Sequence, residues 1–250
     1  MLLMVIMDSN LLWLAIIVLV SYTTQAMSGF GSTILALTLG IHLYPIDVLL
    51  PVLVTLDMVV NLYLVTRHYR HISRPHLFRS ILPAMGFGVL AGIIAFQYIE
   101  GDLLKKLFGS LVIVLSMREL YRLSRKRPDQ FALSNLTAKA CIVAAGIVHG
   151  IYASGGPLLI YAVSRLNLSK SEFRSTLAAV WLIFTVILSA SYLITGKFTA
   201  HSIRFILILL PMILIGILLG ERLHHRIDEN RFKIFVFAVL FIAGLSICIS

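Results

Sequence analysis

Two glycine-containing breaks interrupt apolar stretches of the chain, and both have the chemistry of an anion site. Residues 28–32 read Ser-Gly-Phe-Gly-Ser, and residues 153–157 read Ala-Ser-Gly-Gly-Pro. A helix that starts after such a break points its free N–H groups and its positive dipole end back at the break. We expect an anion to be bound by Gly29, Gly31, Ser32, Thr33, Ser154, Gly155 and Gly156. The alternative for either motif alone is a turn whose small residues let helices cross closely.

Polar side chains inside the apolar segments are the other candidates. Asp57 lies near the middle of an apolar segment, where a carboxylate is costly enough to suggest a function. Asn61 lies one helical turn further on and projects from the same face. We expect the two to couple to a proton or an ion, with a hydrogen bond between helices as the alternative. Gln25 and His149 precede the two breaks, and each either lines a cavity or satisfies the carbonyls that a break exposes.

Metal and nucleophile chemistry are disfavoured by the spacing of the remaining candidates. The histidines at 68, 71 and 76 accompany arginines in a loop without a cysteine or carboxylate, and Cys141 and Cys248 form no C-x-x-C pair. Residues 152–155 partly match the Gly-x-Ser-Gly nucleophile of intramembrane serine proteases, but the first glycine is absent. His149 would lie about 140° around the helix from Ser154, so it could not act as the base. We expect no metal, no cofactor and no catalytic residue.

The composition indicates that these residues are positioned by membrane helices. The chain is 59% hydrophobic and 13% charged with a mean hydropathy of +0.97, whereas about a quarter of a soluble domain is charged. The formal charge of +10 comes from basic residues at the ends of apolar runs, which indicates membrane orientation rather than nucleic-acid binding. The first 66 residues contain no Lys or Arg, so we expect no cleavable signal peptide and retention of the apolar run at residues 11–20.

The apolar segments predict an all-α transmembrane bundle. Six are long enough to span a bilayer: residues 47–66, 76–99, 103–121, 171–195, 202–223 and 231–249. Two more, residues 11–44 and 136–165, contain the breaks. Helix starts are indicated by a capping box at Ser169 and Glu172 and by Pro75 in a first turn.

The two halves of the chain resemble each other. The pattern Leu-Pro-x4-Gly-x3-Gly occurs at residues 82–92 and again at 210–220. We therefore predict a first repeat over 1–130 and a second over 131–250, which together form one membrane domain. Each repeat contains one broken segment and three spans, Pro83 and Pro211 are equivalent bends, and the glycines are close-packing surfaces. The alternative is that proline and small residues are simply common in membrane helices.

The charge distribution predicts how the repeats are oriented. If all eight segments crossed, the basic loops of the first half, at 66–79 and 118–135, would face the side opposite to those of the second half. The conflict disappears if the broken segments are re-entrant hairpins that do not cross. We therefore predict inverted repeats with both termini outside and the breaks near the midplane. Eight crossings in a parallel repeat remain the competing arrangement.

A glycine-rich break opening each half, at residues 27–33 and 149–157, followed by the stretch at 169–181, resembles the sulfite exporter TauE/SafE family. The resemblance covers nearly the whole chain. It implies a multi-pass secondary transporter of the bacterial inner membrane that moves a sulfite- or organosulfonate-like anion by alternating access. Its partners would be that anion, the bilayer and a coupling proton or ion. The exact anion, the direction, the coupling ion and the oligomeric state stay open. The alternatives are a non-transporting sensor or scaffold and, less favoured, an intramembrane serine protease.

Overall fold

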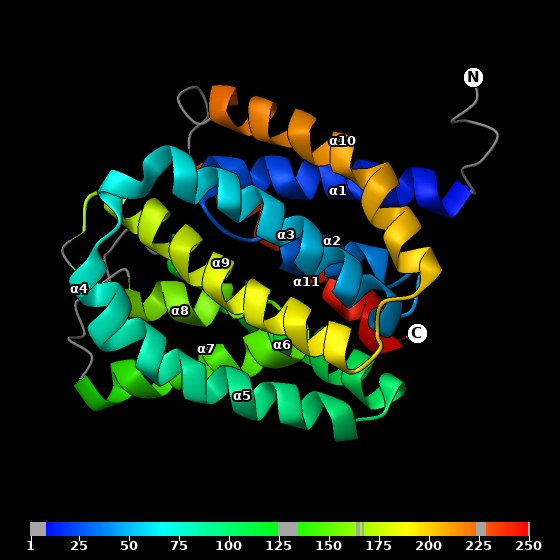
Figure 1. The fold of residues 1–250 in the computed structure, drawn as a ribbon, viewed down its shortest axis with the longest axis horizontal. Helices are drawn as coiled ribbons and strands as arrows, with labels where there is room; N and C mark the ends of the chain where they lie inside the picture. Colours follow the sequence, from blue (N-terminus) through cyan, green and yellow to red (C-terminus); the bar gives the residue numbers. More distant parts are fainter. Residues whose placement is uncertain (1–8, 125–134, 164–165, 167, 224–228, 250) are drawn as a thin grey trace.

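In the computed structural model, residues 9–124, 135–163, 166, 168–223 and 229–249 are described, and they contain helices and no strand. The helices of the first half are α1 (Ser9–Ser28), α2 (Ser32–Gly40), α3 (Ile46–His68), α4 (Arg74–His76), α5 (Leu82–Tyr98) and α6 (Gly101–Ser124). Those of the second half are α7 (Asn135–Tyr152), α8 (Gly156–Val163), α9 (Lys170–Ile194), α10 (Ala200–Leu223) and α11 (Glu229–Ile249). The predicted all-α class is confirmed, and Figure 1 shows most helices lying along one long axis.

The predicted helix-start signals are present at the starts of α9 and α4. Ser169 caps α9, and its backbone N–H in turn donates to the carboxylate of Glu172, so both halves of the capping box are present. Pro75 lies in the first turn of α4. A π-helical turn, Leu77–Ile81, precedes Pro83 at the start of α5, while Pro211 lies inside α10.

Five helices are long and apolar enough to cross a bilayer: Ser9–Ser28, Ile46–His71, Arg74–Tyr98, Ser171–Ile194 and Ala200–Leu223. Shorter apolar helices run over Leu136–Tyr152 and Val236–Ile249. The predicted span at 103–121 lies in α6, which is 24 residues long but is not among the five. Charged residues at 105, 106, 118 and 119 restrict its uncharged stretch to residues 107–117, which is shorter than the ~20 residues a bilayer core takes.

Both broken segments fold back on themselves. In Figure 1, α1 runs from right to left and α2 returns toward the right, whereas α7 runs from left to right and α8 returns toward the left. Each pair therefore begins and ends at the same end of the molecule. Helices α3, α5 and α6 run opposite to α9, α10 and α11, respectively. These directions agree with the predicted inverted repeats, but α1 by itself is long enough to cross a bilayer, so the re-entrant arrangement stays a prediction.

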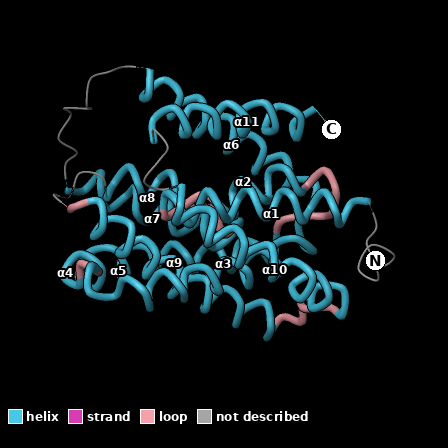
Figure 2. The backbone as a smooth tube through the Cα atoms, turned by 90° about the horizontal axis from the view of Figure 1, so that it is seen from above, coloured by secondary structure: helices cyan, strands magenta, loops and turns pink. Residues whose placement is uncertain are grey.

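The largest helix contacts join the two halves. Helix α5 packs on α7, α1 on α10, α6 on α11 and α3 on α9. Figure 2 shows α6 and α11 as a pair set to one side of the other helices. If the helices of the halves correspond in order, the α5–α7 and α10–α1 contacts are equivalent, as a two-fold relation between inverted repeats would require. The duplication itself stays a prediction.

Glycines allow two of these contacts to be close. A Cβ atom added to Gly88 of α5 would lie 2.1 Å from the carbonyl oxygen of Val143 in α7, and Gly92 makes a similar approach one turn on. On the other contact, a Cβ at Gly220 of α10 would lie 2.6 Å from the carbonyl oxygen of Thr23 in α1. The predicted close-packing role of these glycines is confirmed.

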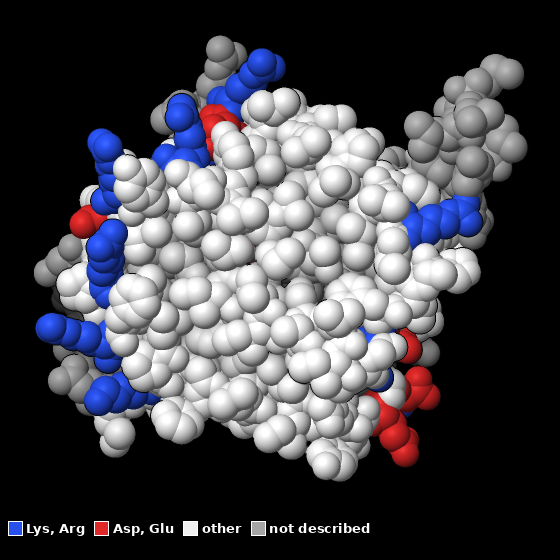
Figure 3. Space-filling view, in the orientation of Figure 1, with Lys and Arg blue, Asp and Glu red and all other residues white. Residues whose placement is uncertain are grey.

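Basic side chains gather at one end of the bundle, on the left in Figure 3, which we call the basic end. Its described members are Arg67, Arg70, Arg74, Arg79, Arg118, Arg122, Lys139, Arg174 and Arg222, whereas Lys105, Lys106, Lys197 and Arg204 belong to the opposite end. Ser9 and Ile249 also lie at the opposite end. The basic residues at 125–127, 165 and 226, which also entered the predicted orientation, lie outside the described residues. That the basic end faces the cytoplasm stays a prediction.

Candidate functional site

The first break, residues 29–31, needs glycine for its backbone shape. Gly29 and Gly31 have φ of +86° and +97°, in the left-handed region that residues with a Cβ rarely adopt. These two residues reverse the chain between α1 and α2. Glycine is therefore required at both positions by the turn itself.

The second break, residues 153–155, needs glycine for a different reason. Its left-handed residue is Ala153, with φ of +52°, rather than a glycine. Gly155 instead packs so closely that a Cβ would lie 2.2 Å from the carbonyl oxygen of Ala145. Both breaks reverse the chain, but the first needs glycine for its backbone conformation and the second needs it for close packing.

The two breaks meet at a cavity of about 20 Å³ between the two hairpins and helices α3 and α9. That is room for about one water molecule. Eight of the predicted site residues line it: Gln25, Gly31, Ser32, Thr33, Asp57, His149, Ser154 and Gly156. The structure therefore brings together residues from both halves that the sequence marked separately.

Three predicted residues do not line the cavity. Gly29 lies under the side chain of Arg174, whose Cγ would be 2.9 Å from an added Cβ, and Gly155 packs on α7. Asn61 is buried behind Asp57. Four lining residues were not predicted: Ile34, Ala153, Pro157 and Trp181.

The first half contributes a cluster of buried neutral donors around one carboxylate. Asp57 accepts a hydrogen bond from Ser32 Oγ at 2.9 Å and one from Asn61 Nδ2 at 2.8 Å. Gln25 Nε2 donates to Asn61 Oδ1 at 3.1 Å, and Ser32 Oγ also contacts Gln25 Oε1. All four side chains are buried. The predicted proximity of Asp57 and Asn61 is confirmed, and Gln25 and Ser32 complete the cluster.

If Asp57 is ionised, the cluster has more hydrogen-bond acceptors than hydrogens available to donate to them. Ser32 has one hydroxyl hydrogen but faces two acceptors, Gln25 Oε1 and Asp57 Oδ1. Rotating the Gln25 amide would not help, because its Nε2 is needed by Asn61 Oδ1. A proton on Asp57 removes the shortage, since the acid can then donate to Ser32 while Ser32 donates to Gln25. The geometry is thus suited to a protonated carboxyl group.

The second half contributes aromatic N–H groups that lack partners. The ring of His149 stacks on that of Trp181, with centroids 5.3 Å apart and planes inclined by 22°. Both side chains are buried. Neither His149 ring nitrogen nor Trp181 Nε1 has a hydrogen-bond partner. Buried donors are costly when unsatisfied, so two such groups on one small cavity indicate a ligand that accepts hydrogen bonds.

The starts of α2 and α8 supply further donors. The Leu35 N–H bonds to the Gly31 carbonyl at 3.1 Å, so residues 32–34 carry the N–H groups that a helix start leaves free. In α8 the corresponding bond runs from Leu159 to Gly155 at 3.2 Å. Pro157 has no N–H, so α8 offers fewer donors. Both helix starts line the cavity, as the anion-site prediction required.

Ser154 and His149 are not arranged as a nucleophile and its base. The Ser154 hydroxyl donates to the carbonyl of Tyr152 at 2.9 Å, while the His149 ring has no hydrogen-bond partner. Among the described residues, no group of three or more His, Cys, Asp or Glu side chains could hold a metal ion. The geometry of Ser154 and His149 therefore does not support a serine nucleophile activated by this histidine.

A larger cavity, of about 380 Å³, lies at the end opposite the basic end, between the α2–α3 turn and the start of α6. Asp47, Asp102, Lys105 and His42 line it. Burial, and secondarily the nearby Lys105, lowers the pKa of His42. Its charges are mixed and it does not include either break, so it is a less suitable anion site than the smaller cavity.

Comparison with known proteins gives a family match over nearly the whole chain. A family model described as sulfite exporter TauE/SafE matches residues 13–247. The curated protein "Probable inner membrane transporter protein TsaS" of Comamonas testosteroni is 27% identical over 173 residues, covering 67% of this chain and 70% of that protein. No solved structure matches the chain significantly. The family match includes both breaks and the whole of the cavity lining.

Proposed function

The chain belongs to the sulfite exporter TauE/SafE family, and from this premise we propose that it is a secondary transporter of a small sulfite- or organosulfonate-like anion. Membership of the family and the transporter relative support a multi-pass membrane transporter of the bacterial inner membrane. They also agree with the expectation that the chain is not an enzyme. The substrate, the coupling and the transport cycle are our proposals.

The observation that carries the proposal is the pair of unpartnered buried rings, His149 and Trp181. An oxyanion in the cavity would accept hydrogen bonds from the indole N–H, from the imidazole and from the N–H groups at the start of α2. These groups are neutral, so the anion would be bound by dipoles rather than by a buried lysine. Paired broken segments that meet in this way are typical of transporter binding sites.

Coupling to protons follows from the position of Asp57 on the same cavity. An ionised carboxylate would repel an arriving anion, whereas a protonated carboxyl group would not. The cluster of Gln25, Ser32 and Asn61 is suited to the protonated form. We therefore propose that a proton on Asp57 and the anion occupy the site together.

The small volume of the cavity indicates that the protein must change conformation to bind its substrate. Space for about one water molecule is too small for an oxyanion with several heavy atoms, so the hairpins have to move apart before substrate binds. We propose that the conformation seen here is closed around the site. Alternating access would then result from movement of the hairpins relative to α3 and α9.

Counterflow in proteoliposomes tests the proposed function. Vesicles loaded with an unlabelled anion are given the same labelled anion outside, with sulfite, thiosulfate, short sulfonates and short carboxylates tested separately. We expect transient accumulation of at least one oxyanion. If none exchanges, the competing reading of a membrane sensor or scaffold is favoured, and labelling of Ser154 by a fluorophosphonate probe would instead favour the protease.

A further inference from the structure

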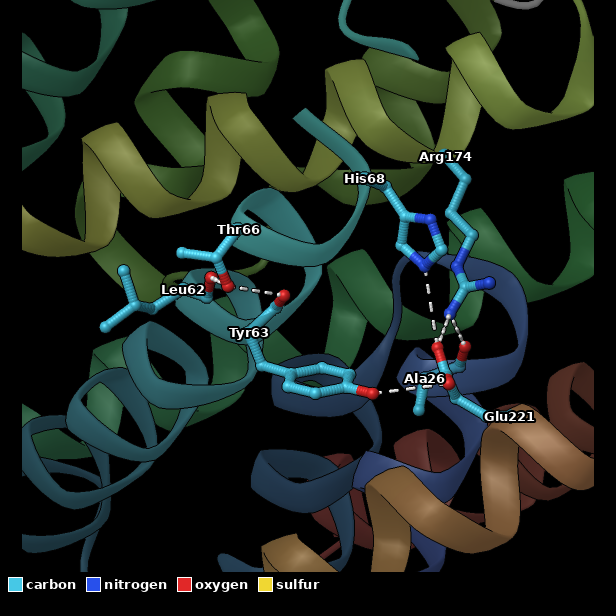
Figure 4. A network of polar contacts seen from close by, with 7 residues as sticks. All are labelled: Ala26, Leu62, Tyr63, Thr66, His68, Arg174 and Glu221. Atoms are coloured by element: carbon cyan, nitrogen blue, oxygen red, sulfur yellow. Dashed lines mark hydrogen bonds and ion pairs between the residues drawn. The ribbon is translucent and has the colours of Figure 1, made fainter. Parts of the chain in front are cut away.

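A second polar cluster joins four helices on the basic-end side of the first break. Figure 4 shows Arg174 of α9 reaching Glu221 of α10 and the carbonyl oxygen of Ala26 in α1. The guanidinium–carboxylate distance is 3.5 Å. From α3, the Tyr63 hydroxyl donates to Glu221 at 3.3 Å, and His68 Nε2 lies 3.6 Å from the same carboxylate.

This cluster is not an ordinary exposed ion pair. The Arg174 side chain is 14% exposed and that of Glu221 is 32% exposed. Surface pairs contribute little, but an ion pair that is partly removed from water leaves a costly unpaired charge when one partner is lost. The pairing therefore holds α9 and α10 together more firmly than a surface contact would.

Arg174 does not line the cavity but contacts residues close in sequence to those that do. Its side chain covers Gly29, where an added Cβ would be 2.9 Å from Arg174 Cγ. It binds the carbonyl of Ala26, the residue after Gln25, and Gln25 lines the cavity. The start of α9 and the ends of α3 and α10 all lie at the basic end, so this cluster lies on the basic-end side of the first break.

The other end of the bundle has different chemistry at the corresponding positions. With Trp181 matched to Asp57, Arg174 corresponds to Leu50, and with Gly220 matched to Gly92, Glu221 corresponds to Ile93. Leu50 is fully buried. If the repeats correspond in this way, an ion pair lies on the basic-end side of the site and apolar residues occupy the equivalent positions on the other side.

We propose that Arg174 and Glu221 form the gate between the anion site and the basic end, and that this pair separates when the site opens there. The inference rests on the proposed transport function. The buried Arg174 Nε has no partner, so the guanidinium has a free N–H for a passing anion. A hydrogen bond to that anion would weaken the hold on Glu221, and arrival of substrate would favour opening.

Side-specific labelling of a cysteine in the cavity tests the gate. The reporter is Ser154→Cys in a background with Cys141 and Cys248 replaced, and a membrane-impermeant thiol reagent is applied to vesicles of each orientation. In Arg174→Gln and in Glu221→Gln we expect labelling from the basic end to be about tenfold faster, with no change from the opposite end. Arg222→Gln is the matched control, because it removes an exposed charge next to Glu221 and should label like the parent.

Two outcomes would overturn the gate: unchanged labelling in both variants, or equal acceleration from both ends, which would indicate general loosening. Glu221→Gln keeps the shape and one acceptor oxygen, so it gives the answer if Arg174→Gln does not fold. The proposed function is tested separately by counterflow in the parent protein. If the variants label faster from the basic end but the parent exchanges no anion, the pair closes that end and the proposed transport is wrong. If the parent exchanges an anion but labelling is unchanged in the variants, transport is supported and the gate is wrong.

Discussion

The rings of His149 and Trp181 lie stacked with centroids 5.3 Å apart on the wall of the central cavity, and neither ring has a hydrogen-bond partner. His149 precedes the second break on α7, whereas Trp181 lies on α9, so this contact joins a hairpin to a spanning helix. In the first half, the corresponding contact is the hydrogen-bonded cluster of Gln25 with Asp57 and its neighbours. One half therefore supplies free donors, and the other supplies the carboxyl group that we propose carries a proton.

The indole N–H of Trp181 should contribute to anion affinity and not to folding. Trp181→Phe keeps an aromatic ring on His149 but removes the donor. We expect the KM for anion exchange to rise about tenfold, as loss of a hydrogen bond to a charged group predicts, with thermal stability unchanged or raised. Trp13→Phe is the control, because Trp13 is 60% exposed on α1 and lies away from the cavity lining. Equal KM values for the two variants would exclude Trp181 from the site.

Asp57→Asn should separate accumulation from exchange. The amide has nearly the shape of the protonated acid and can donate to Ser32 while accepting from Asn61, so the cluster should survive. We expect downhill exchange to persist, while accumulation driven by an imposed pH gradient is lost. The measurement is uptake of the labelled anion with and without that gradient.

The control for this variant is Asp47→Asn, an exposed carboxylate at the start of α3. It should accumulate the anion like the parent. Undiminished accumulation by Asp57→Asn would remove this carboxyl group from coupling, and loss of folding would point instead to a structural hydrogen bond.

Bulk at the breaks should stop transport without preventing membrane insertion. At Gly31 a valine would be strained, because φ is +97°, although space for a Cβ is open. At Gly156 a Cβ would reach Phe30 and Trp181 at 4.0 Å, so the valine methyl groups would enter the cavity. We expect no measurable exchange by Gly31→Val or Gly156→Val in protein that is inserted normally. Gly101→Val lies at the open start of α6 and is not among the residues that line the cavity between the breaks, so it should transport normally. Normal transport by all three variants would reduce the breaks to packing elements.

The close contact between α5 and α7 should be a main source of stability. In Gly88→Ala the new methyl group would collide with the Val143 carbonyl, so the helices must separate, and we expect a loss of about 1–3 kcal/mol. Gly86→Ala, on the same helix, meets only Phe184 at 4.0 Å and should be neutral or more stable by about 0.5–1 kcal/mol. Unfolding by denaturing detergent measures both. Similar stabilities would show that the helices adjust without cost.

Most residues of the candidate site could be marked from the sequence because they are unusual for apolar segments. Asp57, Gln25 and His149 are polar where lipid or packed helices surround the chain, and the glycine breaks cannot continue a membrane helix. Trp181 was not predicted as a site residue, because tryptophan is common in apolar segments. Its N–H indicates a site only when packing leaves that group without a hydrogen-bond partner. Its one signal was its position in the second half, equivalent to Asp57 in the first.

Other features depend on contacts that the sequence does not display. Gly29 and Gly31 look alike in sequence, yet one packs under Arg174 and the other opens on the cavity. The Arg174–Glu221 pair joins residues from separate helices, so no local pattern could predict it. The path of the hairpins, by contrast, followed from the conflict between loop charges and eight crossings.

An anion bound beside Trp181 is the central feature of the proposed transport site. Trp13→Phe leaves Trp181 as the chain's one tryptophan, so its fluorescence can be followed while the exchanged oxyanion is added to purified protein. We predict a saturable change in emission whose half-saturation agrees with the exchange KM, and loss of that change in Gly156→Val. Emission that stays constant while the same protein still exchanges the anion would place the substrate elsewhere and contradict the site described here.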